Sequence, residues 1–408
     1  FMNSIKWLDM LKLRLSWGAL GNNAVDNYEY QSVYNKDNYV LGNSVVPGLA
    51  QIQLANALVS WETTYVTNIG LDFSLFGSKL DGTIEFFNKD THDILIDLPA
   101  PLLVGNASIP TQNAARVRNR GMEMNLKWNH RIGKVNYFVG GNFTFIDNEV
   151  TRFKGEERSI SGTNMIQEGY PINIQYVLAV DRILQTDEDM LFVEKMIKDA
   201  PVDPATGQRV NPFASYGTPK KGDFLYKDLN GDNIIDDNDQ CPIGNPIYPQ
   251  LTAGITAGFE YKGFDFSMLW AGSGKVSRFI SAGLRVPFGG GNYGLLQYMI
   301  DDHWTPETAE TAKTPRFSGA ANANNYTRNS TLWLKDASYI RLKNVQIGYT
   351  FKGEWMKKIH LKNMRIYASG ENLLTFDHLK IADPEATDDK QFQYPLQMIF
   401  NIGLNLNF

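Results

Sequence analysis

The stretch that decides the fold runs from Leu251 to Trp270 and reads LTAGITAGFEY, KG, FDFSMLW. From Leu251 to Tyr261, apolar side chains occupy every second position, and Thr, Gly or Glu fills the positions between them. Successive side chains of a β-strand point to opposite faces, so this period of two predicts a strand with one apolar face. Lys262-Gly263 then forms a two-residue hairpin turn before a second alternating run begins at Phe264.

The same alternation recurs along the chain and predicts ten strands. They cover roughly residues 11–17, 65–76, 80–90, 117–128, 135–146, 251–261, 264–272, 339–351, 361–372 and 399–408. The connections between them alternate in length, beginning with a long one. The long connections cover about 18–64, 91–116, 147–250, 273–338 and 373–398, and the short ones cover about 77–79, 129–134, 262–263 and 352–360.

This alternation of long and short connections is typical of an up-and-down membrane barrel, with short periplasmic turns and long extracellular loops. A soluble β-sandwich gives no reason for it, although alternation alone also describes a half-buried antiparallel sheet. Several polar faces carry Lys, Arg, Glu and Asp, which indicates a wet face. Aromatic residues near strand ends are typical of girdles at the two membrane interfaces: Trp17, Trp128, Tyr261, Trp270, Tyr349 and Phe408. We therefore predict an all-β fold, an antiparallel transmembrane β-barrel.

Composition narrows the possible functions. The 408 residues carry a formal net charge of −5, which does not suggest a nucleic-acid partner. Cys241 is the single cysteine, so an internal disulfide and a multi-thiolate metal site are excluded, and we expect a lone loop cysteine without a role. No segment approaches the ~20 apolar residues that a transmembrane helix needs. No signal peptide opens the chain, so we expect that it was cleaved or that the chain is part of a longer protein.

A series of short motifs occurs in a fixed order along the chain. They are Leu13-Arg14-Leu15-Ser16-Trp17-Gly18 with Gly21-Asn22, Arg120-Gly121-Met122-Glu123, Lys227-Asp228-Leu229-Asn230-Gly231-Asp232, Ile243-Gly244-Asn245-Pro246 with Pro249, His303-Trp304-Thr305-Pro306-Glu307, Pro315-Arg316, Tyr339-Ile340-Arg341-Leu342-Lys343-Asn344-Val345, Gly370-Glu371-Asn372-Leu373, Asp383-Pro384-Glu385 and the terminal Phe408. In this order the motifs resemble the C-terminal half of SusC/RagA-type TonB-dependent outer-membrane transporters of Bacteroidetes. The resemblance covers essentially the entire chain.

The resemblance implies a 22-stranded barrel in the outer membrane, to which this chain contributes about ten C-terminal strands. Phe408 matches the aromatic C-terminus that marks the last strand for barrel assembly. We expect residues 1–408 to be the C-terminal part of one barrel domain, with long extracellular loops at 147–250 and 273–338. By this comparison the plug domain, the segment that engages TonB and about twelve strands lie outside the chain, and the chain enters and leaves the barrel on the periplasmic side.

The resemblance also implies a function. It indicates TonB-dependent active import of an oligomeric nutrient, a glycan or a peptide, with a SusD-type surface lipoprotein as the lid and the rest of the same barrel as a further partner. Two alternatives are a passive porin and a barrel that carries a surface enzyme or an adhesin. A plug encoded upstream would exclude the porin, and a catalytic constellation in a loop would favour the enzyme.

The sharpest local motif is an acidic stretch between residues 228 and 239. Oxygen-bearing side chains and one carbonyl follow EF-hand-like spacing, which suits the roughly six to eight oxygen ligands of Ca²⁺; the ligands would be Asp228, Asn230, Asp232, Ile234, Asp236 and Asp239. Asn233 stands where an EF-hand has Gly, and Asp239 stands where it has Glu. The alternative is an acidic turn held by Asx hydrogen bonds. We predict a structural Ca²⁺ that pins the connection 147–250.

No pattern for catalysis emerges, and we expect the protein not to be an enzyme. The five histidines are scattered, and no HExxH, GxSxG or phosphate-loop motif is present. We interpret Asp301-Asp302-His303 and the acids flanking Pro384 as structural, and Gly289-Gly290-Gly291 as a flexible loop. Loop aromatics could stack on a substrate or pack the loops, and the sequence does not select among Tyr28, Tyr30, Tyr34, Tyr39, Tyr216, Tyr248, Tyr293, Tyr298 and Tyr326. The residues that bind substrate are therefore unknown at this point.

Overall fold

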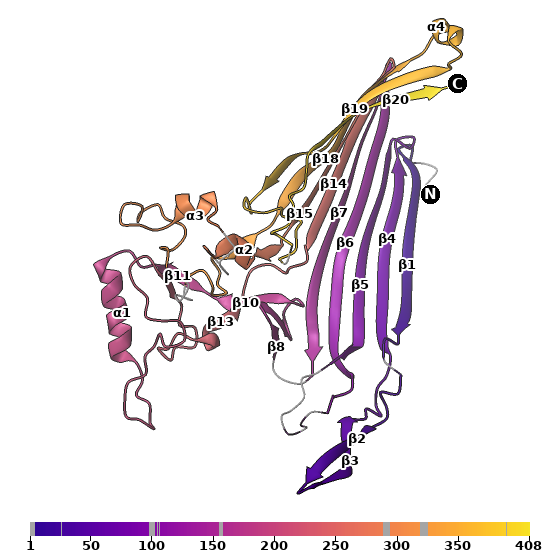
Figure 1. Cartoon of the computed structure of the whole chain (residues 1–408). Coiled ribbons are helices and arrows are strands. Elements are labelled where there is room, and N and C mark those ends of the chain that lie inside the picture. Colours follow the sequence, from indigo (N-terminus) through magenta and orange to yellow (C-terminus); the bar gives the residue numbers. More distant parts are fainter. Residues whose placement is uncertain are drawn as a thin grey trace. The chain divides into compact units, whose positions relative to one another are not determined.

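The computed structural model confirms an antiparallel sheet of ten strands joined in chain order (Figure 1). The structure describes residues 5–408 apart from 26, 98–102, 104, 106, 155–157, 289–293, 319–324 and 389. The predicted loop Gly289-Gly290-Gly291 lies outside the described residues. Within the described part, no helix is long and apolar enough to cross a membrane. The chain divides into two compact units, and each is described by itself.

The sheet contains the ten predicted strands and no others. They are β1 (Leu8–Asn22), β4 (Glu62–Leu75), β5 (Leu80–Ile96), β6 (Gln112–Ile132), β7 (Val135–Phe153), β14 (Leu251–Tyr261), β15 (Phe264–Gly274), β18 (Tyr339–Phe351), β19 (Asn363–Asp377) and β20 (Ile399–Asn407). Neighbours in the chain are neighbours in the sheet, which is the order of an up-and-down barrel wall. The 11 residues of β14 match the roughly 9–11 residues with which a tilted strand crosses a bilayer.

Several strands continue beyond the predicted ends, and most of the added residues lie on the side of the long connections. β6 covers 21 residues although the alternation predicted only 117–128. On the N-terminal side of Met122, the outward face of β6 is charged instead of apolar. There Arg120 pairs with Asp147 of β7 at 2.8 Å. Arg118 pairs with Glu149 in the same way. The apolar pattern of β6 therefore ends before its backbone pairing with β7 does.

The opposite face of the wall is polar and carries ion pairs between strands. In the first unit Arg14 of β1 reaches Asp72 at 2.9 Å and Glu85 at 3.0 Å, so one cation joins β1, β4 and β5. In the second unit Arg365 of β19 donates to Asp265 of β15. These pairs are partly exposed, which agrees with the predicted wet face. Their contribution to stability is small for the same reason.

Glycines on the wall are covered by aromatic rings from the neighbouring strand. Phe73 is paired with Gly82, Phe87 with Gly121, and Tyr367 with Gly403. In each pair the ring lies where a Cβ atom on the glycine would be. The ring protects the bare backbone and replaces the missing side-chain contacts, as in designed sheets that use aromatic rescue of glycine.

Aromatic residues gather near both ends of the apolar band. At the short-turn end of the first unit, the ring of Phe76 lies 6.4 Å from Trp7 and 6.3 Å from Trp128. At the opposite end, Trp17 stacks on Tyr65 at 6.2 Å. In the second unit the short-turn end carries Phe264, Tyr349 and Phe351 in sequential edge contacts, and Trp270 stacks on Phe376 at the other end. This distribution is typical of interfacial girdles.

The long connections contain secondary structure of their own. The connection after β1 forms a hairpin of β2 (Val33–Leu41) and β3 (Ser44–Gln53). The connection after β7 contains β8 (Arg158–Ser161), β9 (Asn164–Gln167), β10 (Ile174–Leu178), β11 (Val180–Ile183), α1 (Asp187–Asp199), β12 (Phe224–Tyr226), the 3₁₀ turn η3 (Asp237–Asp239) and β13 (Gln240–Pro242). The remaining elements are β16 (Ser277–Phe279), α2 (Ala282–Arg285), α3 (Gln297–Asp302), β17 (Leu334–Asp336) and α4 (Glu354–Lys358).

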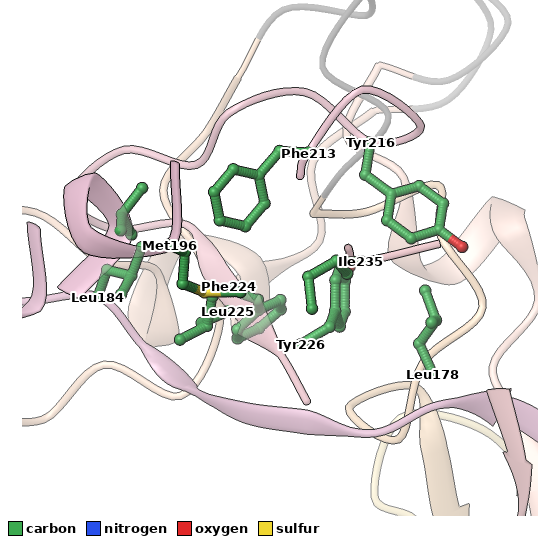
Figure 2. Packing of buried hydrophobic residues seen from close by; sticks show 10 residues of the cluster. Leu178, Leu184, Met196, Phe213, Tyr216, Phe224, Leu225, Tyr226 and Ile235 are labelled. Carbon is green, nitrogen blue, oxygen red and sulfur yellow. The ribbon is translucent and has the colours of Figure 1, made fainter. Parts of the chain in front are cut away.

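The two largest clusters of buried apolar side chains lie in these connections, although the wall also buries a few apolar residues such as Val150 of β7. One cluster gathers β11, β12, α1 and nearby turns around Phe224 and Leu225 (Figure 2). A second cluster surrounds Trp333, whose side chain is fully buried. The wall instead exposes its apolar face, as at Leu15 and Trp17, each 70% exposed. A bilayer accounts for so large an uncovered apolar surface.

A buried carboxylate ties two of the long connections together. Asp223, which is 1% exposed, accepts hydrogen bonds from Asn325 Nδ2 at 2.6 Å and Arg316 Nη2 at 3.0 Å. Next to it, Gly222 has φ +83° and lies so close to the Trp304 ring that a Cβ atom would overlap it. The motifs around Trp304 and Arg316 therefore build the loop scaffold.

A methyl group added at Gly121 tests the packing of the wall. In the Gly121→Ala variant, the new Cβ would overlap the carbonyl oxygen of Phe145 and the ring of Phe87. We expect a loss of about 1–3 kcal/mol, as for other overpacked sites. Heat-modifiable migration in gels measures the folded fraction. Gly18→Ala is the matched control, because a Cβ there meets nothing within 4 Å, and equal loss in both variants would contradict the prediction.

Candidate functional site

A β-bulge turns one arginine of β18 away from the apolar face. From Val345 to Phe351, apolar residues occupy odd positions, and at Ile340 and Leu342 they occupy even positions. The register shifts between Leu342 and Asn344 against both neighbouring strands. The extra residue reverses the alternation, so Arg341 shares the polar face with Thr375 of β19.

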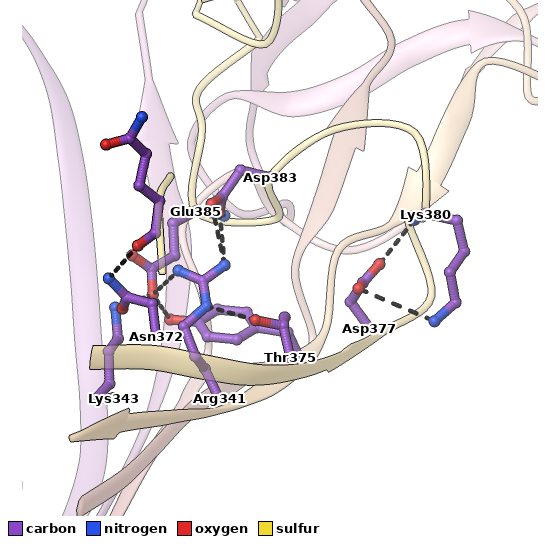
Figure 3. Close-up of polar contacts among 10 residues, drawn as sticks. Arg341, Lys343, Asn372, Thr375, Asp377, Lys380, Asp383 and Glu385 are labelled. Atoms are coloured by element: carbon purple, nitrogen blue, oxygen red, sulfur yellow. Dashed lines mark hydrogen bonds and ion pairs between the residues drawn. The ribbon is translucent and has the colours of Figure 1, made fainter. Parts of the chain in front are cut away.

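Arg341 organises a polar cluster at the long-loop end of β18 (Figure 3). Its side chain is only 3% exposed. Nη2 donates to both carboxylate oxygens of Asp383 at 3.0 Å, Nε donates to Thr375 Oγ1 at 2.8 Å, and Nη1 lies 3.3 Å from Glu385 Oε1. The guanidinium also lies over the ring of Tyr339, 5.3 Å from its centroid. One arginine thus holds the connection after β19 against the wall.

Glu385 is the second acidic member of this cluster. It accepts a hydrogen bond from Tyr339 Oη at 2.6 Å and another from Lys343 Nζ. Burial alone would raise the pKa of Glu385, but the hydrogen bonds from Lys343 and Tyr339 outweigh it and lower the pKa below its usual range. Asp383 Oδ1 also accepts the backbone N–H of Glu385, which forms the turn around Pro384. Both carboxylates are therefore held in a fixed orientation.

A pocket of about 750 Å³ lies between this connection and α2. Its polar lining includes Asp383, Glu385 and Lys390, and its apolar and aromatic lining includes Phe392, Tyr394 and Leu284. A concave site with a few fixed polar groups among apolar surfaces is the usual form of a ligand site. The volume is within the range of roughly 300–1,000 Å³ that such sites occupy.

Two glutamines hold the segment that lines the pocket. Gln391 is buried, donates from Nε2 to the Phe279 carbonyl at 2.9 Å and accepts the Ser281 N–H at 3.0 Å, which fastens the segment to β16. Gln397 Nε2 donates to Tyr394 Oη at 3.0 Å, and the backbone carbonyl of Gln397 accepts a hydrogen bond from Asn372 Nδ2. The Tyr394 ring is 83% exposed although its hydroxyl is held. A fixed, exposed aromatic ring is suited to stack on a ligand.

The acidic stretch 228–239 is a compact turn closed by Asx hydrogen bonds. Asp228 accepts from the N–H groups of Gly231 and Asn233 at 2.7 and 2.8 Å, and Asp239 accepts from those of Leu229 and Asp236 at 2.8 and 3.0 Å. The remaining members follow the same scheme: Asn230 accepts from Asp232, Asp232 from Ile234, and Asp236 from Asn238. Asn233 has φ +59°, a value that Asn tolerates.

The fit of this stretch to Ca²⁺ is incomplete. The donors are oxygens, which suits Ca²⁺ chemically. However, among the described residues no three His, Cys, Asp or Glu side chains are placed to hold a metal ion. Asp239 is fully buried, and this burial raises its pKa. The carboxylate oxygens are directed at backbone amides of the loop, and the calcium site stays a prediction.

The other residues singled out by sequence have structural surroundings. Cys241 is half-buried on β13, where burial raises the pKa of its thiol. His303 stacks on Phe317 with ring centroids 4.4 Å apart. Among the loop tyrosines, Tyr216 and Tyr326 are buried in the loop cores, whereas Tyr248 is exposed. Tyr293 lies outside the described residues.

Comparison with known proteins identifies the class. The model of the family described as TonB dependent receptor-like, beta-barrel matches residues 4–373. The chain belongs to this family of TonB-dependent outer-membrane receptors. It is 28% identical to TonB-dependent receptor P39 of Formosa agariphila and 26% identical to TonB-dependent receptor SusC of Bacteroides thetaiotaomicron. Each alignment covers 100% of this chain, but only 41% and 38% of the respective relative.

Solved structures show the same fold. The RagAB peptide transporter aligns with a TM-score of 0.73 and 24% identity, over 100% of this chain and 42% of the other. The closed-closed state of the RagAB peptide importer aligns with a TM-score of 0.72 and 25% identity, with the same coverage. The chain thus spans about two fifths of the relatives that it matches. The expected membership of the SusC/RagA type is confirmed.

Removal of the central arginine tests the polar cluster. In the Arg341→Met variant, Asp383 and Glu385 lose their shared cation inside a crowded site. Breaking a buried pair in this way costs about 3 kcal/mol. We expect residues 378–397 to exchange their amide hydrogens faster, measured by mass spectrometry. Arg120→Met is the matched control because its pair with Asp147 is largely exposed, and unchanged exchange in Arg341→Met would contradict the assigned role.

Proposed function

We propose that this chain forms part of an importer that moves oligomeric nutrients, glycans or peptides, actively across the outer membrane. The observation that carries the proposal is the match of the entire chain to TonB-dependent receptors, combined with a wall of strands that carries large folded loops at one end. In this proposal the long connections face the cell exterior. A SusD-type lipoprotein covers these connections as a lid, and TonB supplies energy through a segment outside this chain.

The pocket beside Arg341 supports a role in substrate contact. Carboxylates with fixed orientation accept hydrogen bonds from hydroxyl or amide groups, and an exposed aromatic ring covers an apolar face of a sugar or side chain. Both features occur together at Asp383, Glu385 and Tyr394. The relatives named above include a transporter for peptides and the receptor SusC, and we retain both glycans and peptides as substrate classes.

Dependence on TonB tests active import. We expect cells that carry the full-length protein to accumulate a labelled oligomer only when the proton-motive force and the TonB-binding segment are intact. The measurement is uptake of fluorescent oligosaccharide and oligopeptide libraries, with and without an uncoupler. Full uptake after deletion of the TonB segment would contradict the proposal and favour a passive porin. A deletion that abolishes surface expression is recognised by antibody labelling of the loops.

Truncation of Tyr394 tests the pocket. In the Tyr394→Ala variant, the exposed ring is lost while the buried scaffold is left intact. We expect the concentration for half-maximal uptake to rise about threefold to tenfold, because aromatic stacking contributes about 0.5–1.5 kcal/mol. Tyr248→Ala removes another exposed aromatic ring, which lies outside the pocket lining, and serves as the control. Equal effects of the two changes would exclude a specific contact.

We also propose a structural Ca²⁺ in the stretch 228–239. The spacing of its oxygen donors and the positive φ of Asn233 support this proposal. Calorimetry on protein stripped with a chelator should show uptake of one Ca²⁺, which the Asp228→Asn variant should lose. Because Asx hydrogen bonds close the loop, an absence of heat on Ca²⁺ addition would identify it as a purely hydrogen-bonded turn.

A further inference from the structure

An apolar groove crosses four strands on the outward face of the second unit. It has a volume of about 670 Å³ and lies near the short-turn end of β15, β18, β19 and β20. Its side walls are Phe264, Ile347, Tyr349, Ile366 and Ile402. The lining is almost entirely apolar, and Phe264, Ile347 and Ile402 are each more than half exposed.

The register of the strands explains the depression. Ala368 of β19 is opposite Ile347 of β18 on one side and opposite Ile402 of β20 on the other. All three point outward, because Phe264, Tyr349 and Ile366 are also in register on this face. A methyl group between two larger aliphatic side chains leaves space in the apolar surface.

A basic turn continues from the end of this groove. The groove includes Phe351, the last residue of β18, and the segment from Lys352 to Lys362 follows with four lysines and one glutamate. Lys352, Lys358 and Lys362 are exposed, and none makes an ion pair with a described residue. Trp355 of α4 meets the Phe351 ring edge-on at 6.2 Å and is half exposed, as expected of an interfacial aromatic.

We propose that this groove is a binding site for one anionic phospholipid. The acyl chain lies over Ala368 between Ile347 and Ile402, and the phosphate is held by Lys352 and Lys358 at the basic turn. Two features favour this occupant. The groove opens on the face that contacts hydrocarbon, and the adjoining turn has an excess of positive charge that complements a phosphate.

The proposal rests on the membrane barrel and not on the direction or substrate of transport. A bilayer covers the outward face of the wall along its whole length, and what distinguishes this groove is the basic segment 352–362 that directly follows its lining residue Phe351. The other short connections of the sheet are smaller: Phe76 to Lys79, Gly133-Lys134 and Lys262-Gly263. They supply matched positions for control variants.

Native mass spectrometry of the full-length protein extracted from outer membranes tests the site. Dioleoyl phosphatidylglycerol and dioleoyl phosphatidylcholine are titrated separately, and glycerol phosphate tests the headgroup without chains. We expect one phosphatidylglycerol to bind about tenfold more tightly than phosphatidylcholine. The Lys352→Gln/Lys358→Gln variant should lose this preference, and Ala368→Phe, which fills the groove, should weaken both lipids.

Two control variants decide whether binding is specific. Lys79→Gln/Lys134→Gln removes the same charge from other short turns, and Ala257→Phe adds the same ring to the outward face of β14. Both should bind phosphatidylglycerol as the unchanged protein does. Equal losses in test and control variants, binding of glycerol phosphate alone with equal affinity, or dimerisation that Ala368→Phe abolishes would each overturn the proposal. Heat-modifiable migration confirms that every variant is folded.

Discussion

Backbone hydrogen bonding in a hydrocarbon environment is the constraint on which the rest of this structure depends. An unpaired N–H or C=O group in the bilayer costs several kcal/mol, so each segment that crosses must pair with neighbours along its entire length. The strands from β4 to β19 each have a neighbour on both sides, and their antiparallel registers are interrupted only by local shifts. Side chains then have only to match their surroundings, apolar toward the lipid and polar toward water. This explains why the wall tolerates glycines, which are covered by aromatic rings from the neighbouring strand.

The same constraint is relaxed where the strands enter water. There the backbone remains paired, but side chains of either face carry charge, as at Arg118 and Arg120. Bulges also cost little free energy there, because water forms hydrogen bonds with the backbone N–H and C=O groups that a bulge leaves unpaired. The bulge beside Lys343 uses this freedom to bring Arg341 to the polar face, where it holds two carboxylates. The candidate site therefore lies near the long-loop end of β18, where an irregular backbone costs little free energy.

The loops solve a different physical problem. They have no bilayer against which to bury apolar groups, so they build their own cores around Phe224 and Trp333. Asp223 then joins separate connections by charged hydrogen bonds inside a buried site. A loop scaffold with cores of this kind presents the pocket beside Tyr394 on a firm base. Rigid support of this kind is what a selective entrance requires.

The sequence by itself determined the ten strands, their order and the alternation of long and short connections, because a period of two is a local property of the chain. It located strand centres well and strand ends poorly, since Arg118 and Arg120 interrupt the apolar pattern but not the pairing. The sequence shows that apolar residues change from even to odd positions between Leu342 and Val345, but it does not show that this change is a β-bulge.

Only the tertiary structure decided where that switch directs Arg341, and which distant acids, Asp383 and Glu385, meet it. The groove over Ala368 likewise depends on the register of three strands, which no local pattern encodes. The physical reason is common to both. Periodicity specifies the face on which a side chain lies, whereas the neighbours of that side chain depend on pairing between segments that are far apart in the chain.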